Sequence, residues 1–274
     1  MKVTGNITKM HTSLVKGEAH YELPVGDELI PMNNIIGNLI KLKYEDEIHC
    51  IGCGRKTNKS FNQGFCFPCF KSLAQCDMCI MKPETCHFAE GTCREPEWAE
   101  AHCMQDHFVY LANSSGIKVG ITRGTQIPTR WIDQGASQAL PIFKVKNRLL
   151  SGQIEVVIKQ HVSDKTSWQR MLKGVPDSVD LIARRDELVA ECQKEIKQIE
   201  KNAGSDGVHL LDKEKQIEIG FPVTEYPVKV SSFNFDKKPL VEGTLMGIKG
   251  QYLIFDTGVI NIRKFGGYKV TVSI

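Results

Sequence analysis

Apolar and polar side chains alternate with a period of two through the first part of the chain. The segments His20–Pro24 and Asn38–Tyr44 carry this alternation, and no stretch before residue 50 repeats apolar residues at helical spacing. Because successive residues of a strand face opposite sides, the pattern is typical of short, half-buried strands. We therefore predict a β-rich region over residues 1–49.

A second β-rich region is predicted at the other end of the chain, over residues 208–274. Short apolar runs at Val241–Met246, Gln251–Asp256 and Val259–Arg263 are separated by glycine-containing turns, which is typical of a β meander. Since both ends favour strands, we expect them to form one small sheet or barrel around the inserted middle of the chain. The predicted fold class is therefore α+β.

The middle of the chain predicts a ββαβα module over residues 107–175. Strands 108–112 and 117–122 are joined by a turn, and Pro141 within a third strand, 140–145, indicates a position at a sheet edge. Helical patterns begin at Pro128, run from Ile154 to Val162 and run again from Lys165 to Lys173.

The longest helical pattern lies within residues 176–207, which we predict to be a helix and a linker. From residue 177 to 203, apolar side chains recur about every seven residues, with Asp177 or Ser178 as the N-terminal cap. About three heptads is short for a coiled coil, so we expect this helix to pack on the core. The predicted stripe comprises Ile182, Val189, Cys192, Ile196 and Ile199.

Length and composition are those of a globular protein of about two domains. The chain has 274 residues, of which 41% are hydrophobic and 24% are charged, and its net charge is only +3. This excludes a disordered chain and an evenly basic, histone-like coat. No stretch approaches the roughly 18 apolar residues of a membrane helix, and no apolar secretion signal is present at the N-terminus. We expect a cytoplasmic protein.

Nine of the ten cysteines fall between residues 50 and 103. Cys50 and Cys53 form one CxxC pair, and Cys66 and Cys69 form another, with twelve residues between the pairs. In a reducing compartment disulfides are disfavoured, whereas two CxxC knuckles supply the four thiolates of a structural zinc site. We therefore predict a zinc-binding segment over residues 50–106.

A second zinc ion is predicted in the same segment, which gives about two per chain. Its ligands are left open, because Cys76, Cys79, Cys86, Cys93 and Cys103 compete with His87, His102 and His107. The first four of these cysteines are the simplest quartet, and an iron–sulfur cluster is the alternative to zinc. With four protein ligands each, both sites would be structural.

Positive charge is concentrated in the middle of the chain. Residues 108–175 contain ten Lys and Arg against three Asp and Glu. Such an excess predicts a surface that binds the phosphates of DNA or RNA, and a solvated lysine face is the alternative. The predicted nucleic-acid-binding residues are Lys118, Arg123, Arg130, Lys144, Lys146 and Arg148.

The predicted module resembles the GIY-YIG nuclease family. The likeness rests on the element order, on Val109–Leu111 and Lys118–Thr122 in the paired strands, and on Arg130 and Glu155 in the following helices. The whole chain also resembles an uncharacterised prokaryotic family without an assigned activity. That second likeness is carried by the cysteines and by the segments Gly91–Trp98, Arg130–Ala136 and Asp164–Trp168.

The GIY-YIG resemblance implies a catalytic site of Tyr110, Lys118, Arg130 and Glu155. In that family a tyrosine helps to activate water, a glutamate holds a divalent ion such as Mg²⁺ or Mn²⁺, and an arginine stabilises phosphate charge. Here Lys118 replaces the second tyrosine, and Tyr110 either fills the first tyrosine's place or lies one position beyond it. His107 is a candidate replacement base.

Three functions follow from these patterns. The first is a zinc protein that binds nucleic acid and hydrolyses phosphodiesters. The second is a nucleic-acid or ribonucleoprotein binder without catalysis, which the substitution at Lys118 favours. The third is a zinc-ribbon adaptor for proteins. Glu155 has a plain alternative role as the i,i+4 ion-pair partner of Lys159 on a helix surface.

Overall fold

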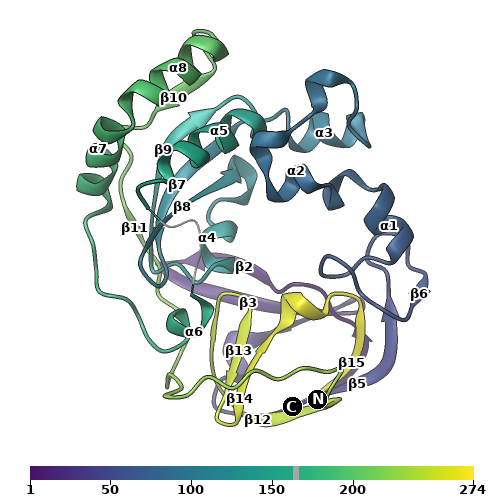
Figure 1. Cartoon of the computed structure of the whole chain (residues 1–274). Coiled ribbons are helices and arrows are strands. Elements are labelled where there is room, and N and C mark those ends of the chain that lie inside the picture. Colours follow the sequence, from purple (N-terminus) through teal and green to yellow (C-terminus); the bar gives the residue numbers. More distant parts are fainter. Residues whose placement is uncertain (163–166) are drawn as a thin grey trace.

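The computed structural model describes residues 1–162 and 167–274, and within them the strands form three sheets (Figure 1). The largest sheet has seven strands and joins the two ends of the chain. Its hydrogen-bonded neighbours, in order, are β1 (Lys2–Asn6), β15 (Tyr268–Ser273), β5 (Leu39–His49), β12 (Leu240–Lys249), β13 (Tyr252–Phe255) and β14 (Gly258–Asn261), with β6 (Lys56–Thr57) beside β5.

The expectation that both ends share one sheet is confirmed, because β1 pairs with β15 and β15 with β5. Of the two expected forms, one small sheet or a barrel, the strand pairing matches the sheet. The path of neighbouring strands begins at β1 and ends at β14, so the sheet is open across the described residues. A three-stranded sheet packs against it instead, formed by β2 (His11–Val15), β3 (Glu18–Val25) and β4 (Glu28–Pro31).

These two sheets form what we call the β-rich unit, and they share one apolar core. Tyr21 and Leu23 of β3 pack in the same cluster as Ile40 and Leu42 of β5 and Phe255 of β13. In β5 the residues from Leu39 to Lys43 alternate between exposed and buried, as the period-two pattern predicts. The core therefore lies between sheets whose strands come from both ends of the chain.

The ββαβα module has the predicted order of elements, with β7 (His107–Asn113) paired to both β8 (Ile117–Arg123) and β9 (Gln138–Val145). Helix α4 (Thr129–Asp133) follows β8. Helix α5 (Arg148–Ile158) begins six residues before the predicted apolar repeat, because the Asn147 side chain caps it by accepting a hydrogen bond from the Leu150 N–H at 3.0 Å.

The prediction that Pro141 marks a sheet edge is wrong, since β9 has neighbours on both sides. On one side, Pro141 lies opposite Tyr110 at a register shift in the ladder with β7. On the other side two short strands leave a gap at Pro141, so no partner requires the N–H that proline lacks. Those strands are β10 (Val208–Leu210), which pairs with Phe143–Val145, and β11 (Ile217–Glu218), which pairs with Gln138 and Ala139.

The predicted long helix is two helices, α7 (Leu181–Glu191) and α8 (Gln193–Ala203), which meet at Cys192. Asp180, and not Asp177 or Ser178, caps α7 through hydrogen bonds from the N–H groups of residues 182 and 183. Of the predicted stripe, Cys192 and Ile196 are buried, Val189 and Ile199 pack against the same core, and Ile182 is exposed. The buried apolar residues of α7 are Leu181 and Leu188, which continue the stripe at helical spacing.

The cysteine segment, residues 50–106, contains short helices: α1 (Phe67–Ser72), α2 (Met78–Met81) and α3 (Pro96–His102), with single turns such as η3 (Pro83–Thr85) between them. In Figure 1 it arches beside the module and above the β-rich unit. Near the end of the module, α6 (Trp168–Met171) occupies part of the helix that we predicted from Lys165. That predicted start, and most of the segment Asp164–Trp168, lie outside the described residues. Within the described ranges, no helix has the length and apolar character needed to cross a membrane.

Candidate functional site

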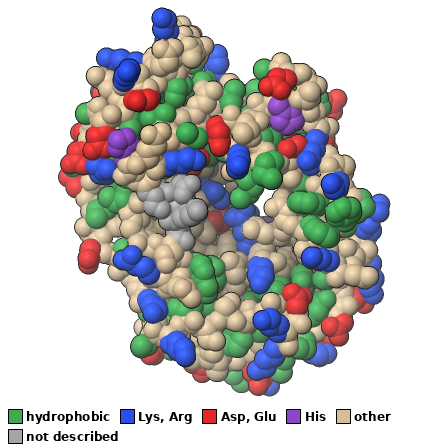
Figure 2. Space-filling model, in the orientation of Figure 1, with side chains coloured by type: hydrophobic (Ala, Val, Ile, Leu, Met, Phe, Trp, Pro, Cys, Tyr) green, Lys and Arg blue, Asp and Glu red, His purple; other side chains and the backbone are tan. Residues whose placement is uncertain are grey.

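A cleft of about 610 Å³ opens where the module, the cysteine segment and the β-rich unit meet. Figure 2 shows this hollow with Lys and Arg side chains inside it. Residues from β8, α4 and α5 form one side, and Ile80–Glu84 of the cysteine segment form another. Lys9 and Arg263 of the β-rich unit complete the lining. The cleft is therefore assembled from parts of the chain that are far apart in sequence.

Three of the four predicted catalytic residues line this cleft: Lys118 on β8, Arg130 on α4 and Glu155 on α5. The fourth, Tyr110, lies beneath it and is 0% exposed. Its hydroxyl donates a hydrogen bond at 3.0 Å to Oε1 of Gln134, which lines the cleft. The structure thus gathers all four residues around one cleft, with the tyrosine in its floor.

Gly120 explains how the tyrosine fits there. Tyr110 and Gly120 are partners in the β7–β8 ladder, and a Cβ atom at residue 120 would lie 2.7 Å from the Tyr110 hydroxyl. Only a residue without a side chain leaves room for the ring at this point.

The Tyr110 hydroxyl is held in its neutral form. Burial raises the pKa of Tyr110, and the nearby carboxylate of Glu155 acts in the same direction, whereas Arg130 and the hydrogen bond to Gln134 oppose the shift. A phenol with a raised pKa is a poor base at neutral pH. In this structure Tyr110 can therefore orient Gln134 and Arg130 more readily than it can remove a proton.

The cleft is strongly cationic, with eight Lys and Arg against three acidic residues in its lining. One acid, Asp133, is already neutralised: its carboxylate lies 2.9 Å from Lys9 Nζ, its side chain is 3% exposed, and it accepts a hydrogen bond from Gln251 at 2.8 Å. Arg123 and Arg130, by contrast, form no ion pair with any part of the chain that the structure describes. They leave positive charge available to an anionic ligand.

Arg148 connects the cleft to the cysteine segment. Its Nη2 donates to the carbonyl oxygen of Ile80 at 2.7 Å, and its buried Nε has no hydrogen-bond partner among the described residues. Burial lowers the pKa of Arg148, and the thiol of Cys103 acts in the opposite direction. The guanidinium therefore lies between the cationic cleft and the cysteines.

Two of the six predicted nucleic-acid-binding residues lie outside the cleft. Lys144 forms an ion pair with Asp106 at 2.8 Å. Lys146 borders a separate hollow of about 350 Å³ and donates to the carbonyl oxygen of Ala203 at 3.3 Å. Conversely, sequence analysis missed Lys9, Lys82, Lys159 and Arg263, which line the cleft. The sequence predicts Lys159 only as an ion-pair partner of Glu155. The other three residues lie outside the basic segment 108–175, so the excess of positive charge in that segment does not point to them.

His107 is poorly placed to serve as a replacement base. It is fully buried, its Nδ1 lies 2.7 Å from the carbonyl oxygen of Gln105, and burial lowers its pKa to about 4. It is not part of the cleft lining. Trp131 is buried in the core, and Trp168 is half-buried and stacks on Tyr252 at 5.7 Å between ring centroids.

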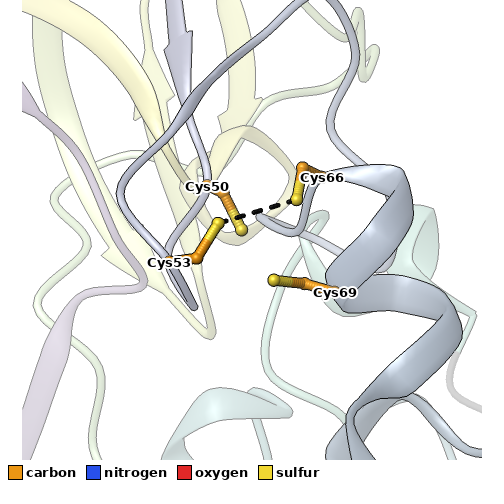
Figure 3. A group of neighbouring side chains, drawn as sticks. All are labelled: Cys50, Cys53, Cys66 and Cys69. Carbon is orange, nitrogen blue, oxygen red and sulfur yellow. Dashed lines mark hydrogen bonds between the residues drawn. The ribbon is translucent and has the colours of Figure 1, made fainter.

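The first cysteine quartet fits a metal ion. Figure 3 shows Cys50, Cys53, Cys66 and Cys69 pointing toward one another from the two knuckles, and their Sγ atoms all lie within 4.8 Å of one another. The Cys53–Cys66 sulfur distance is 3.8 Å, close to the separation that a tetrahedron with Zn–S bonds of about 2.3 Å requires. The predicted cluster is thus present, and it could hold one zinc ion.

Electrostatics of this quartet also suit a cation. Burial opposes ionisation of Cys50, yet hydrogen bonds from the backbone of Cys66, Cys53 and Gly52 lower its pKa to about 6. Burial and the other three thiols raise the pKa of Cys69 to about 12. Four thiolates so close together repel one another, and a divalent ion at their centre removes that repulsion.

The other five cysteines do not form one group. Cys79, Cys86, Cys93 and Cys103 line an enclosed cavity of about 10 Å³ between α2 and α3. Cys76 instead packs with Cys50, Phe65 and Cys66 of the first cluster. Asp77, Cys79 and His87 also place three ligand atoms within 4.8 Å of one another. The other two histidines have roles elsewhere: His102 stacks on Trp98 at 4.2 Å, and His107 is buried at the start of β7.

Comparison with known families bears out one resemblance. Residues 37–270 match the family described as "Protein of unknown function (DUF2797)", so the expected likeness to an uncharacterised family is confirmed. Searches among curated proteins and among solved structures found no match. The GIY-YIG resemblance stays a prediction, which the element order of the module and the gathering of its four residues support.

Proposed function

This chain belongs to the DUF2797 family of unknown function, and we propose that it binds nucleic acid through the cationic cleft. The observation that carries the proposal is the convergence of Lys118, Arg123 and Arg130 on one concave surface. A phosphodiester backbone is the polyanion that such a surface would recognise.

The chemistry of the lining supports phosphate as the ligand. Arginine presents a planar array of donors that matches phosphate oxygens, and two arginines here lack acidic partners within the described ranges. Binding would release counterions from the nucleic acid, so the affinity should fall as salt rises. The cysteine segment contributes Lys82 to the same surface, so metal ligation within that segment would support binding by holding this side of the cleft in place.

Fluorescence anisotropy with labelled single- and double-stranded DNA and RNA, at several salt concentrations, tests this proposal. We expect a linear fall of log affinity with log salt. Arg130→Glu should weaken binding by about tenfold or more, since one phosphate contact becomes a repulsion. Lys144→Glu makes the same charge change outside the cleft and should alter affinity less than about twofold. Equal effects of the two variants, or no binding at low salt, would refute the proposal.

A second candidate function is metal-dependent hydrolysis of the bound phosphodiester. The observation that favours it is the position of Glu155, which lines the same cleft and lies within electrostatic reach of Tyr110 and Arg148. Glu155 would hold Mg²⁺ or Mn²⁺, which prefer oxygen ligands and would polarise the phosphate. Arg130 and Lys118 would stabilise the negative charge that develops on the phosphate. Neutral Tyr110 would hold Gln134 and Arg130 in place.

Glu155→Gln separates this candidate from binding alone. The substitution keeps the shape of the side chain and removes its charge, so cleavage should fall by about 10²-fold or more while binding is largely kept. Omission of Mg²⁺ and Mn²⁺ is a cleaner control than EDTA, because a chelator also threatens the cysteine sites. If the wild-type protein binds but cleaves nothing with any divalent ion, only the binding function stands.

A further inference from the structure

The enclosed cavity between α2 and α3 has the composition of a second metal centre. Its four thiols come from four local positions: Cys79 within α2, Cys86 directly after η3, Cys93 in the next loop and Cys103 at the end of α3. The cavity volume of about 10 Å³ is of the size that one small ion needs. Of the other seven lining residues, Asp77 and His87 are polar and five are apolar, namely Ala74, Ile80, Phe88, Trp98 and Ala99.

We infer that Cys79, Cys86, Cys93 and Cys103 bind a second zinc ion as four thiolates. Four sulfurs in one lining suit an ion that prefers soft ligands. Cys79 lies within electrostatic reach of Cys86 and Cys103, and Cys103 within reach of Cys86 and Cys93, so the four thiols would draw together around an ion.

This ligand set excludes Cys76, although Cys76 and Cys79 have CxxC spacing. The turn Ala74–Cys76 ends before α2 begins, and the Cys76 side chain packs with Cys50 and Phe65 of the first cluster. Cys103 takes its place, even though 24 positions separate it from Cys79 along the chain. The two metal centres therefore divide the cysteines by their place in the fold and not by their order.

Asp77 and His87 also line the cavity, and each places a ligand atom within 4.8 Å of the Cys79 sulfur. Both already have partners within the protein. Asp77 forms an ion pair with Arg94 Nε at 2.6 Å, and His87 Nδ1 lies 2.7 Å from the Thr92 hydroxyl, with its Nε2 3.6 Å from Asp77. The proposal therefore assigns ligation to the four sulfurs and treats His87 and Asp77 as the competing ligands that the test must separate.

Arg148 provides a second observation that favours negatively charged thiolates in this cavity. Its buried Nε–H has no acceptor among the described residues, and the guanidinium lies within electrostatic reach of Cys79 and Cys103. A neutral thiol is a weak acceptor, whereas a zinc-bound thiolate carries the negative charge that such a donor needs. Four thiolates around Zn²⁺ leave two negative charges, of which Arg148 offsets one.

A zinc ion at this second site would also fix the backbone on one side of the cleft. Residues Ile80–Glu84, which form one side of the cleft, all lie between the ligands Cys79 and Cys86. Tying both ends of this short stretch to one ion fixes its path. The second zinc would therefore shape the cleft without touching the ligand bound there.

Zinc content per chain, measured by elemental analysis of purified protein, tests the assignment. We expect two zinc ions in wild type, one in Cys103→Ser, and two in both Cys76→Ser and His87→Ala. One zinc in wild type, loss of zinc from Cys76→Ser or His87→Ala, or two zinc ions in Cys103→Ser would overturn it. So would iron with inorganic sulfide in place of zinc.

If Cys103→Ser does not fold, X-ray absorption at the zinc edge of the wild-type protein tests the same assignment, because it identifies the atoms bound to zinc without any substitution. With both sites formed by four thiolates, the first shell should contain only sulfur at about 2.3 Å. A nitrogen or oxygen component would show that His87 or Asp77 is a ligand, and the assignment would fail. Neither measurement depends on nucleic-acid binding.

Discussion

The two sides of the cleft are built in different ways. The side formed by β8, α4 and α5 rests on the apolar core of the module, where Val109, Leu111 and Ile154 are fully buried. The side formed by Ile80–Glu84 belongs to a segment whose own core is small and consists largely of cysteine: Cys50, Phe65, Cys66 and Cys76, with Cys69, Phe70 and Leu73 packed against them. Burial of apolar surface stabilises the first side, whereas we expect the second side, which has only a small core, to depend on metal ligation.

The two sides meet at Gly152 of α5. A Cβ atom there would lie 2.5 Å from the backbone nitrogen of Glu84 and 2.7 Å from the carbonyl carbon of Pro83. The Arg148–Ile80 hydrogen bond crosses the same junction. A ligand in the cleft would therefore depend on two sources of stability, joined by a close backbone contact.

Removal of metal should produce the largest effect. Structural zinc contributes on the order of 10 kcal/mol to the folding of small metal-dependent units. After chelation, we expect amides of residues 50–106 to lose protection in hydrogen-exchange mass spectrometry, while β5, β7 and β15 keep theirs. Affinity for nucleic acid should fall by about tenfold or more, because one side of the cleft is lost. Uniform loss of protection over the whole chain would show that the two sides do not differ as described.

Gly152→Ala should disturb the junction between the sides. The added methyl group overlaps backbone atoms that cannot rotate away, so we expect a loss of about 1–3 kcal/mol in the free energy of unfolding, measured with urea. Gly174→Ala is the matched control, since a Cβ atom at residue 174 meets nothing within 4 Å. An equal effect of the two variants would argue against a tight contact at Gly152.

Charge reversal on each side should separate their contributions to binding. With metal present, Arg123→Glu and Lys82→Glu should each weaken nucleic-acid binding by about tenfold. In the chelated protein, Arg123→Glu should still weaken the residual binding, whereas Lys82→Glu should have little further effect. Anisotropy titrations of both variants with and without chelator measure this. The same penalty for Lys82→Glu in both states would place Lys82 on a side that needs no metal.

Lys146→Gln should have the smallest effect. Lys146 lines the smaller hollow with Asp106 and Arg123; it is not part of the lining of the main cleft, which that hollow adjoins at Arg123. We expect affinity to change by less than about twofold, since an exposed charge outside the contact surface contributes only weakly through screened electrostatics. A reduction as large as that of Arg130→Glu would extend the binding surface around the edge of the module.

The sequence alone determined those features that depend on neighbours along the chain. Alternating apolar residues predicted the strands at both ends, and the order of elements in the module followed from short-range periodicity and turn residues. The first cysteine quartet was also predictable, because each CxxC knuckle places two sulfurs together by local geometry. These features need few contacts between distant residues.

Only the tertiary structure decided how distant residues combine. It placed Lys9 and Arg263 beside Arg130 in one cleft, paired Lys144 with Asp106, and moved Cys76 away from Cys79 while bringing Cys103 toward it. Composition and spacing carry no information on such long-range packing, because a charge or a thiol acquires its role from whatever lies opposite it in the folded chain. The candidate site is therefore a property of the fold: four of the eight cationic residues in the cleft lining were not predicted from the sequence as binding residues.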